Sequence, residues 1–168
     1  MSGIARLAPA ERRDLLADLV ALEPGVKVET ARDGYLFVRF PDGVAARFFW
    51  YPYPLAEAVE EACGFAVASA LDLGLMKLGA LISRGTRRDF VDLWALCRRL
   101  PLDELLGRAA EKFGHVGDFP LQAAKALADF SEAEDEPMPA LEPPVAWSAV
   151  REWASGEAAR LGREVLVP

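Results

Sequence analysis

The sequence predicts an α+β fold, with a small antiparallel sheet followed by a helical bundle, and three observations support this prediction. Strand-like runs separated by Asp-Gly pairs fill residues 26–50. Apolar residues recur at helical spacing over most of residues 70–168. The chain has 168 residues, of which 52% are hydrophobic, and this is enough to bury a core. We therefore predict a single domain over residues 1–168, with a sheet-containing part at 1–69 and a helical part at 70–168.

The sheet-containing part has clear turn signals. Asp33-Gly34 and Asp42-Gly43 separate three strand-like runs, and Asp-Gly is a strong hairpin signal, so the runs should form an antiparallel meander. Pro52 follows the third run, and a proline cannot continue a central strand. The predicted elements are a helix at 9–22, strands at 26–30, 35–40 and 44–50, a short helix at 55–63 and a short strand at 65–68.

The remainder of the chain has helical spacing throughout, apart from one connector. Residues 134–144 carry four prolines and should be extended. The predicted helices lie at 72–83, 87–99, 102–113, 121–132 and 145–161.

The charge of the chain argues against generic binding to DNA. The formal net charge is -7, and an acidic surface repels phosphate backbones. Nevertheless, Arg84, Arg87 and Arg88 cluster in the sequence, and Lys77 precedes them by about two helical turns. A local basic group on an acidic protein suits a small anion, such as a nucleotide phosphate, better than DNA.

The sequence also indicates the cellular compartment of the protein. No apolar run approaches the ~20 residues that cross a bilayer, and the first ten residues lack the pattern of a signal peptide. Cys63 and Cys97 stand alone in apolar or helical surroundings, which is typical of reduced thiols. We therefore predict a cytoplasmic protein without membrane association.

The most informative stretch, residues 70–100, predicts two antiparallel helices with a very short turn. Asp72 stands where a first-turn carboxylate would satisfy free N–H groups of the first helix. Gly85 suits the left-handed position that ends a helix. Thr86 followed by Asp89 resembles a capping box for the second helix.

This hairpin concentrates opposite charges. Asp89 and Asp92 are three residues apart, so their carboxylates share a helix face and repel unless a cation is near. Arg88 can reach Asp92 within the helix, and Lys77 and Arg84 can reach across the turn. Two interpretations remain open: a salt-bridged hairpin that only stabilises the fold, or a polar site at which Lys77 meets a phosphate.

The same residues resemble motifs of the AbiEii/AbiGii-type nucleotidyltransferases. Asp72-Leu-Gly-Leu-Met-Lys77 is similar to the family's D-x-x-x-x-K motif, and Arg88-Asp89-Phe-Val-Asp92 to its R-D-x-x-D motif. The aromatic passage 48–54 resembles the strand that precedes these motifs. Residues 127–134 and 144–147 resemble later family segments, so the resemblance covers roughly residues 26–153.

The resemblance implies a nucleotidyltransferase module followed by a helical bundle, in a toxin–antitoxin or phage-defence system with a cognate antitoxin. By resemblance, Lys77, Asp89 and Asp92 would be catalytic. Lys77, Arg84 and Arg88 would bind nucleotide, and Asp72 would support the site.

The chain departs from the family pattern at its beginning. Family members usually carry a G-[GS]-x-A-L helix start and then a strand with D-x-D, whose carboxylates hold the Mg²⁺ ions of nucleotidyl transfer. Here Gly3 is followed by Ile4, and no D-x-D precedes Asp72. We therefore predict that the chain is inactive as it stands, and that Mg²⁺ and an NTP act only if the missing half is supplied from upstream of Met1 or by another polypeptide.

Other polar residues have simpler interpretations. Asp33 and Asp42 fall in predicted turns, and Glu29 is the sheet carboxylate best placed to serve a site. The lone histidine, His115, has no partner in sequence for a metal site and is predicted to be a loop residue. The sequence thus predicts no metal ligands.

Two classes of function remain open. The first is an enzyme that transfers NMP from an NTP to RNA, protein or another acceptor. The second is a non-catalytic binding or dimerisation module with the same fold. An incomplete sheet leaves an exposed edge, which favours a homodimer or a partner-bound form.

Overall fold

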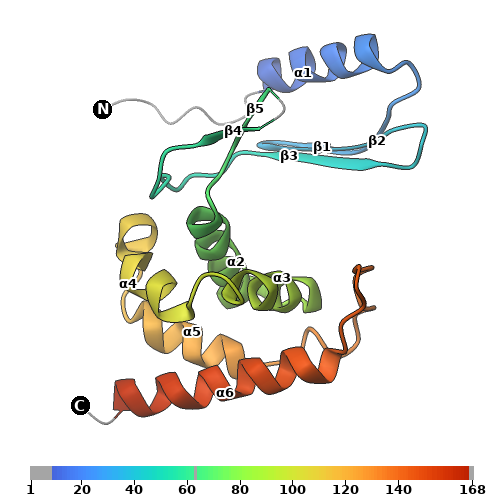
Figure 1. The fold of residues 1–168 in the computed structure, drawn as a ribbon. Coiled ribbons are helices and arrows are strands. Elements are labelled where there is room, and N and C mark those ends of the chain that lie inside the picture. Colours follow the sequence, from blue (N-terminus) through green and yellow to red (C-terminus); the bar gives the residue numbers. More distant parts are fainter. Residues whose placement is uncertain (1–8, 63, 167–168) are drawn as a thin grey trace. The chain divides into compact units, whose positions relative to one another are not determined.

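The computed structural model describes residues 9–62 and 64–166 and divides into two compact units. The first unit ends at Tyr53 and the second begins at Pro54. Each unit is described by itself (Figure 1). The α+β class is confirmed, since helices accompany small antiparallel sheets. The prediction of a single domain stays a prediction.

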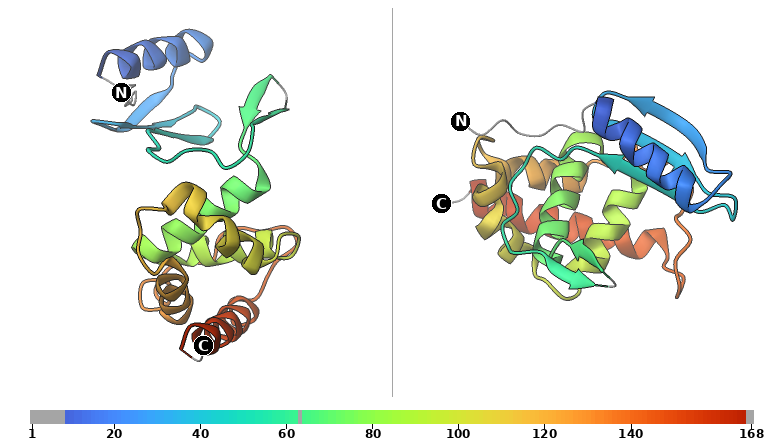
Figure 2. Two further views of the ribbon diagram at one scale, coloured as in Figure 1. Left: turned by 90° about the vertical axis from the view of Figure 1, so that its left-hand side faces the viewer. Right: turned by 90° about the horizontal axis from the view of Figure 1, so that it is seen from above.

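The first unit consists of a helix and a three-stranded antiparallel sheet in the order β1-β2-β3. Its elements are α1 (Pro9–Leu22), β1 (Lys27–Arg32), β2 (Tyr35–Arg39) and β3 (Ala45–Phe49), as the sequence predicted to within two residues. The central strand β2 buries Leu36 and Val38 completely, because alternate side chains of a strand point to one face. Helix α1 lies along the sheet (Figure 2).

The second unit opens with a hairpin that the sequence did not predict. Residues 55–62 contain no helix; instead β4 (Glu60–Ala62) pairs antiparallel with β5 (Phe65–Val67). Cys63, which ended the predicted helix, lies outside the described residues. Gly64 makes the turn with φ of 80°, a conformation that L side chains rarely adopt. The predicted strand at 65–68 is confirmed as β5.

Five helices follow the hairpin and pack into a bundle. They are α2 (Ala70–Arg84), α3 (Arg87–Cys97), α4 (Leu102–Phe113), α5 (Phe119–Ala128) and α6 (Trp147–Leu166). Helix α2 contacts α3, α4 and α5, and α6 lies against α3 and α5 (Figure 1). The core is made of fully buried apolar side chains from these helices, among them Leu75, Leu78, Phe90, Leu105, Leu127 and Val150.

Helices α5 and α6 differ from their predicted ranges at both ends, by two to five residues. Helix α5 starts two residues early, because Pro120 is compatible with the first turn of a helix, and it ends at Ala128 before the Asp129 and Ser131 side chains close a turn. Helix α6 begins at Trp147, two residues later than predicted, and continues to Leu166, five residues beyond the predicted end. In the described part of the chain, no helix has the length and hydrophobicity that a membrane span requires.

Candidate functional site

The α2–α3 hairpin is built from local capping interactions, as predicted. Gly85 ends α2 in the left-handed conformation, with φ of 57° and ψ of 34°. Thr86 caps α3, because its hydroxyl accepts from the backbone N–H of Asp89 and donates to the Asp89 carboxylate at 2.6 Å. Only these two residues separate the helices, so side chains near the end of α2 face those in the first turns of α3.

Asp89 is the centre of the polar cluster on this hairpin. Arg84 approaches it with two nitrogens, Nε at 2.8 Å and Nη2 at 2.9 Å, in a bidentate pair. Lys77 Nζ lies 3.6 Å from Asp89 Oδ1. The Asp89 side chain is 1% exposed, so its charge is neutralised inside the fold.

Lys77 is shared between the two carboxylates of α3. Its Nζ lies 2.5 Å from Asp92 Oδ2, and Arg88 Nε reaches the same oxygen at 3.9 Å. The exposed fractions of the side chains are 28% for Lys77, 31% for Asp92 and 70% for Arg88. The Lys77 cluster, defined as Lys77, Arg84, Arg88, Asp89 and Asp92, is therefore closed on the Asp89 side and open to solvent on the Arg88 side.

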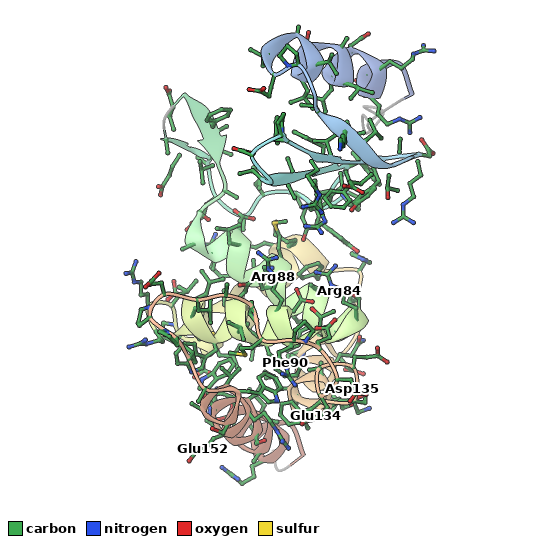
Figure 3. The ribbon with its side chains drawn as sticks, turned by 90° about the vertical axis from the view of Figure 1, so that its right-hand side faces the viewer. Arg84, Arg88, Phe90, Glu134, Asp135 and Glu152 are labelled. Atoms are coloured by element: carbon green, nitrogen blue, oxygen red, sulfur yellow. The ribbon has the colours of Figure 1, made fainter. Side chains whose placement is uncertain are left out.

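Figure 3 shows how the cluster is oriented on α3. Arg88 lies on the side of α3 away from α6, with Arg84 of α2 beside it, and Phe90 lies on the side toward α6. Phe90 is fully buried and packs its ring 5.7 Å from that of Trp147. The apolar face of α3 thus fixes the helix in the bundle and leaves the two arginines at the surface.

The environment of Asp89 favours its ionised form. Burial, the largest single influence, acts to raise the pKa of Asp89, but the hydrogen bonds from Arg84 and Thr86 and the charges of Arg84 and Lys77 outweigh it, so the pKa is lowered. The hydrogen bond to Asp89 in turn raises the pKa of Arg84. Both shifts favour the charged forms of Asp89 and Arg84, so this pair is an ion pair at neutral pH.

Asp72 takes part in a different arrangement. It lies in the first turn of α2, as predicted, but its side chain is fully buried and its Oδ1 lies 2.6 Å from Lys112 Nζ on α4. Asp72 also accepts backbone N–H bonds from Ala56 at 3.0 Å and Glu57 at 3.1 Å. The structure brings the other five predicted site residues together and places the Asp72 carboxylate against α4 and residues 56–57.

Lys112 is the buried partner of Asp72 that sequence analysis missed. A signal was present: Lys112 lies seven residues after Leu105 and three after Ala109, on the apolar stripe of α4. A lysine at such a position needs a buried carboxylate partner. The partner is Asp72, forty residues earlier in the chain, and sequence spacing cannot identify a pair at that distance.

Arg87 also departs from the basic group that the sequence suggested. Its side chain turns to the α5–α6 connector, where it donates to the carbonyls of Ala133 at 2.8 Å and Glu134 at 2.6 Å. Its guanidinium stacks on the Trp147 ring at 4.8 Å. Arg87 therefore fastens the connector to α3 and is not part of the Lys77 cluster.

The remaining candidates have structural partners in the described part of the chain. Glu29 pairs with Arg39 at 2.9 Å, and Asp42 accepts from the Val44 N–H in its turn. His115 lies in the turn after α4. Over residues 9–62 and 64–166, no three His, Cys, Asp or Glu side chains form a group that could hold a metal ion.

Comparison with known protein families identifies the region that carries the hairpin. Residues 38–152 match the model of the nucleotidyl transferase AbiEii toxin of type IV toxin–antitoxin systems. This chain belongs to the AbiEii family. The match includes the whole of the Lys77 cluster, so the AbiEii relationship and the hairpin geometry concern the same residues.

An uncharacterized protein of Aquifex aeolicus (strain VF5) is 35% identical over 116 residues, which are 67% of this chain and 54% of the relative. The chain thus spans about half the length of this relative. No solved structure matches the chain.

The cluster's chemistry suits a phosphate and does not suit a metal ion. Both carboxylates already have cationic partners. Asp89 pairs with Arg84 and Lys77. Asp92 pairs with Lys77 and Arg88. A divalent ion would have to displace these cations to reach carboxylate oxygens. Lys77 and Arg88 can instead offer N–H donors to an anion on their solvent side while the aspartates hold them in place.

Proposed function

We propose that this AbiEii-family chain is a nucleotidyltransferase-like, cytoplasmic protein of a toxin–antitoxin or phage-defence system, and that it binds a nucleotide phosphate at Lys77, Arg84 and Arg88. A cognate antitoxin is its proposed partner. The observation that carries the proposal is the placement of Lys77 between Asp89 and Asp92 within the region matched by the family.

In this proposal the aspartates are positioning residues and the cations bind. Asp89 holds Arg84 and Lys77 from the buried side, and Asp92 holds Lys77 and Arg88 from the open side. A phosphate approaching from solvent meets Lys77, Arg88 and Nη1 of Arg84, a nitrogen that takes no part in the bidentate Arg84–Asp89 pair. Mg²⁺ would accompany the bound NTP; no step of transfer is assigned to the residues of the cluster.

We further propose that the chain does not catalyse transfer by itself. The support is the sequence before Asp72, which carries neither the G-[GS]-x-A-L nor the D-x-D motif. Two-metal transfer requires convergent carboxylates, and those of the Lys77 cluster are already paired with cations. A polypeptide supplying a D-x-D strand would complete the reaction.

Calorimetric titration of the full chain with ATP, GTP, CTP and UTP, each in turn, tests the binding part of the proposal. We expect at least one NTP to bind and Lys77→Met to weaken it at least ~10-fold, since a charge-assisted bond is worth about 1.5–3 kcal/mol. Lys125→Met, on the exposed surface of α5, is the matched control. Absence of NTP binding by the unaltered chain would refute the nucleotide role.

The catalytic part is tested separately, with labelled NTPs, Mg²⁺ and a mixture of RNA and protein acceptors. We expect no label to be transferred by the chain alone. Transfer that Lys77→Ala abolishes would show that the chain is an active enzyme.

A non-catalytic association module is the second candidate, and the sheet of the first unit favours it. All six residues of the edge strand β1 are exposed, and β2 is its one neighbouring strand among the described residues. An exposed edge of this kind is a template for pairing. Light scattering after size exclusion should then show a dimer that Val28→Lys, in β1, disperses. A monomer at micromolar concentration would count against this candidate.

A further inference from the structure

A second basic feature of the helical unit lies at the other end of the α2–α3 hairpin. A hollow of about 570 Å³ is lined by Ala70 at the start of α2 and by Trp94, Ala95, Leu96, Arg98 and Arg99 at the end of α3. None of these residues belongs to the Lys77 cluster. The volume falls within the range of small-ligand sites and is large enough for one nucleotide.

Among the described residues, the two arginines of this hollow lack the carboxylate or carbonyl partners that most other arginines of the bundle have. Arg84, Arg88, Arg108, Arg151 and Arg160 pair with carboxylates, and Arg87 binds backbone carbonyls. In the described part of the chain, no carboxylate pairs with Arg98 or Arg99, and both are exposed. Arginines are favourable at the C-terminal end of α3, because the helix dipole is negative there. That interaction leaves the N–H donors of the two exposed guanidiniums available to a ligand.

The hollow also presents a flat face. The Arg98 guanidinium lies 5.2 Å from the centroid of the half-buried Trp94 ring, so the two groups form a stacked pair. Small side chains, Ala70 and Ala95, line the hollow beside them. A planar ring can therefore approach without displacing a bulky neighbour.

We propose that this hollow binds a nucleotide, with the phosphate at Arg98 and Arg99 and the base stacked on the Trp94–Arg98 pair. Two adjacent guanidiniums, neither of which pairs with a carboxylate of the described residues, match the charge of a phosphate, and the stacked pair matches a base of any identity. An acidic peptide supplies the charge but no planar face. The ligand is either a free nucleotide or one nucleotide of a single strand, and both have the chemistry that the hollow recognises.

The test measures the binding of three ligands, AMP, ribose 5-phosphate and pentauridylate, to the full chain at low ionic strength. Binding is detected by NMR or by tryptophan fluorescence. We expect AMP to bind at least ~5-fold more tightly than ribose 5-phosphate, because stacking adds about 1–3 kcal/mol per base. Binding of pentauridylate ~10-fold tighter than AMP identifies a single strand as the source, and equal binding identifies a free nucleotide. Equal binding of AMP and ribose 5-phosphate, or tight binding of a pentaglutamate, would overturn the proposal.

Variants separate the hollow from the rest of the surface. The double variant Arg98→Gln/Arg99→Gln should weaken the binding of AMP at least ~10-fold. For pentauridylate, it should reduce the slope of log K against log salt concentration by about 1.4. The control Lys125→Gln/Arg163→Gln removes the same charge from exposed positions of α5 and α6 and should change the affinity less than ~2-fold. Equal effects of the two double variants would contradict a specific site.

The ring is tested in the same way. Trp94→Phe should keep most of the affinity and Trp94→Leu should lose the preference for AMP over ribose 5-phosphate, with circular dichroism confirming that both variants fold. Lys77→Met should leave binding at this hollow unchanged, so failure here and failure of the Lys77 site are distinguishable. Trp94→Leu that keeps the preference for AMP would overturn the stacking assignment.

Discussion

Lys112 Nζ lies 2.6 Å from Asp72 Oδ1, and neither side chain is exposed to solvent. Lys112 also donates to the Pro54 carbonyl at 2.7 Å, and Asp72 accepts from the N–H groups of Ala56 and Glu57. The pair therefore joins α2 and α4 to the first residues of the second unit. Asp72, which resembles the first residue of a family motif, acts here as a structural anchor for the helix that carries Lys77.

Removing one member of this pair should be strongly destabilising. Lys112→Met leaves a buried carboxylate without its cation, and we expect a loss of about 3–5 kcal/mol in the free energy of unfolding, measured in urea. The double variant Asp72→Asn/Lys112→Met should recover part of this loss, because no buried charge remains and the amide oxygen can still accept one of the two bonds from the N–H groups of residues 56 and 57. Lys125→Met on the surface should change stability by less than about 0.5 kcal/mol. A double variant as unstable as Lys112→Met would show that the buried charge is not the cause.

Arg84 and Arg88 should differ in their effect on stability, although both belong to the Lys77 cluster. Arg84 makes two bonds to the buried Asp89, whereas Arg88 reaches Asp92 at 3.9 Å from an exposed position. We expect Arg84→Ala to cost about 1 kcal/mol, after allowance for the solvent exposure of Arg84, and Arg88→Ala about 0–0.5 kcal/mol. Thermal unfolding of the two variants side by side measures the difference. Equal losses would mean that the bidentate Arg84–Asp89 pair stabilises the hairpin no more than the exposed contact of Arg88 with Asp92.

The hairpin and its cluster could be predicted from sequence because their determinants are local. Gly85, Thr86 and Asp89 act within five residues of chain, and the helical repeat fixes which face carries Asp92. The same reasoning placed α1 and the three strands of the first sheet. Each of these elements has a turn or cap residue at its boundary.

The parts that sequence did not reveal depend on distant partners or on very short elements. The β4–β5 hairpin has three residues in each strand, too few to show an alternating pattern, and its predicted helix was wrong. The division between Tyr53 and Pro54 also has a non-local basis, because residues 54–57 are held by Asp72, Lys112 and Arg108. The nucleotide roles of the Lys77 cluster stay a prediction.

Acid should weaken the contribution of Asp89 to stability. The pKa of Asp89 is lowered from 3.8, so its ionised form is favoured by folding. This stabilisation is complete above pH ~4 and is lost as the pH falls through the pKa of the folded state. The difference in urea midpoint between the unaltered chain and Asp89→Asn should therefore narrow below pH ~4. Asp135→Asn, at an exposed position of the connector, should show no such narrowing, and a difference for Asp89→Asn that is constant down to pH ~2.5 would contradict the charge pairing.

Close approach of α2 and α4 gives two glycines opposite responses to the same substitution. A Cβ added at Gly74 of α2 would lie 2.6 Å from Leu105 Cδ2, whereas one added at Gly107 of α4 would meet nothing within 4 Å. Leu105 is fully buried and has little room to move, so overpacking should exceed the gain in helix propensity. We expect Gly74→Ala to lower the free energy of unfolding by about 1–2 kcal/mol and Gly107→Ala to raise it by up to about 1 kcal/mol.

A double-mutant cycle identifies the contact responsible. Leu105→Ala creates space beside Gly74, so Gly74→Ala introduced in that background should cost less than it does alone, or become stabilising as the methyl group fills part of the cavity. Urea denaturation of the four proteins gives the coupling energy. Additive effects would show that contact with Leu105 is not the cause of the destabilisation by Gly74→Ala. The close packing of α2 on α4, which holds Lys112 against Asp72, would then need another explanation.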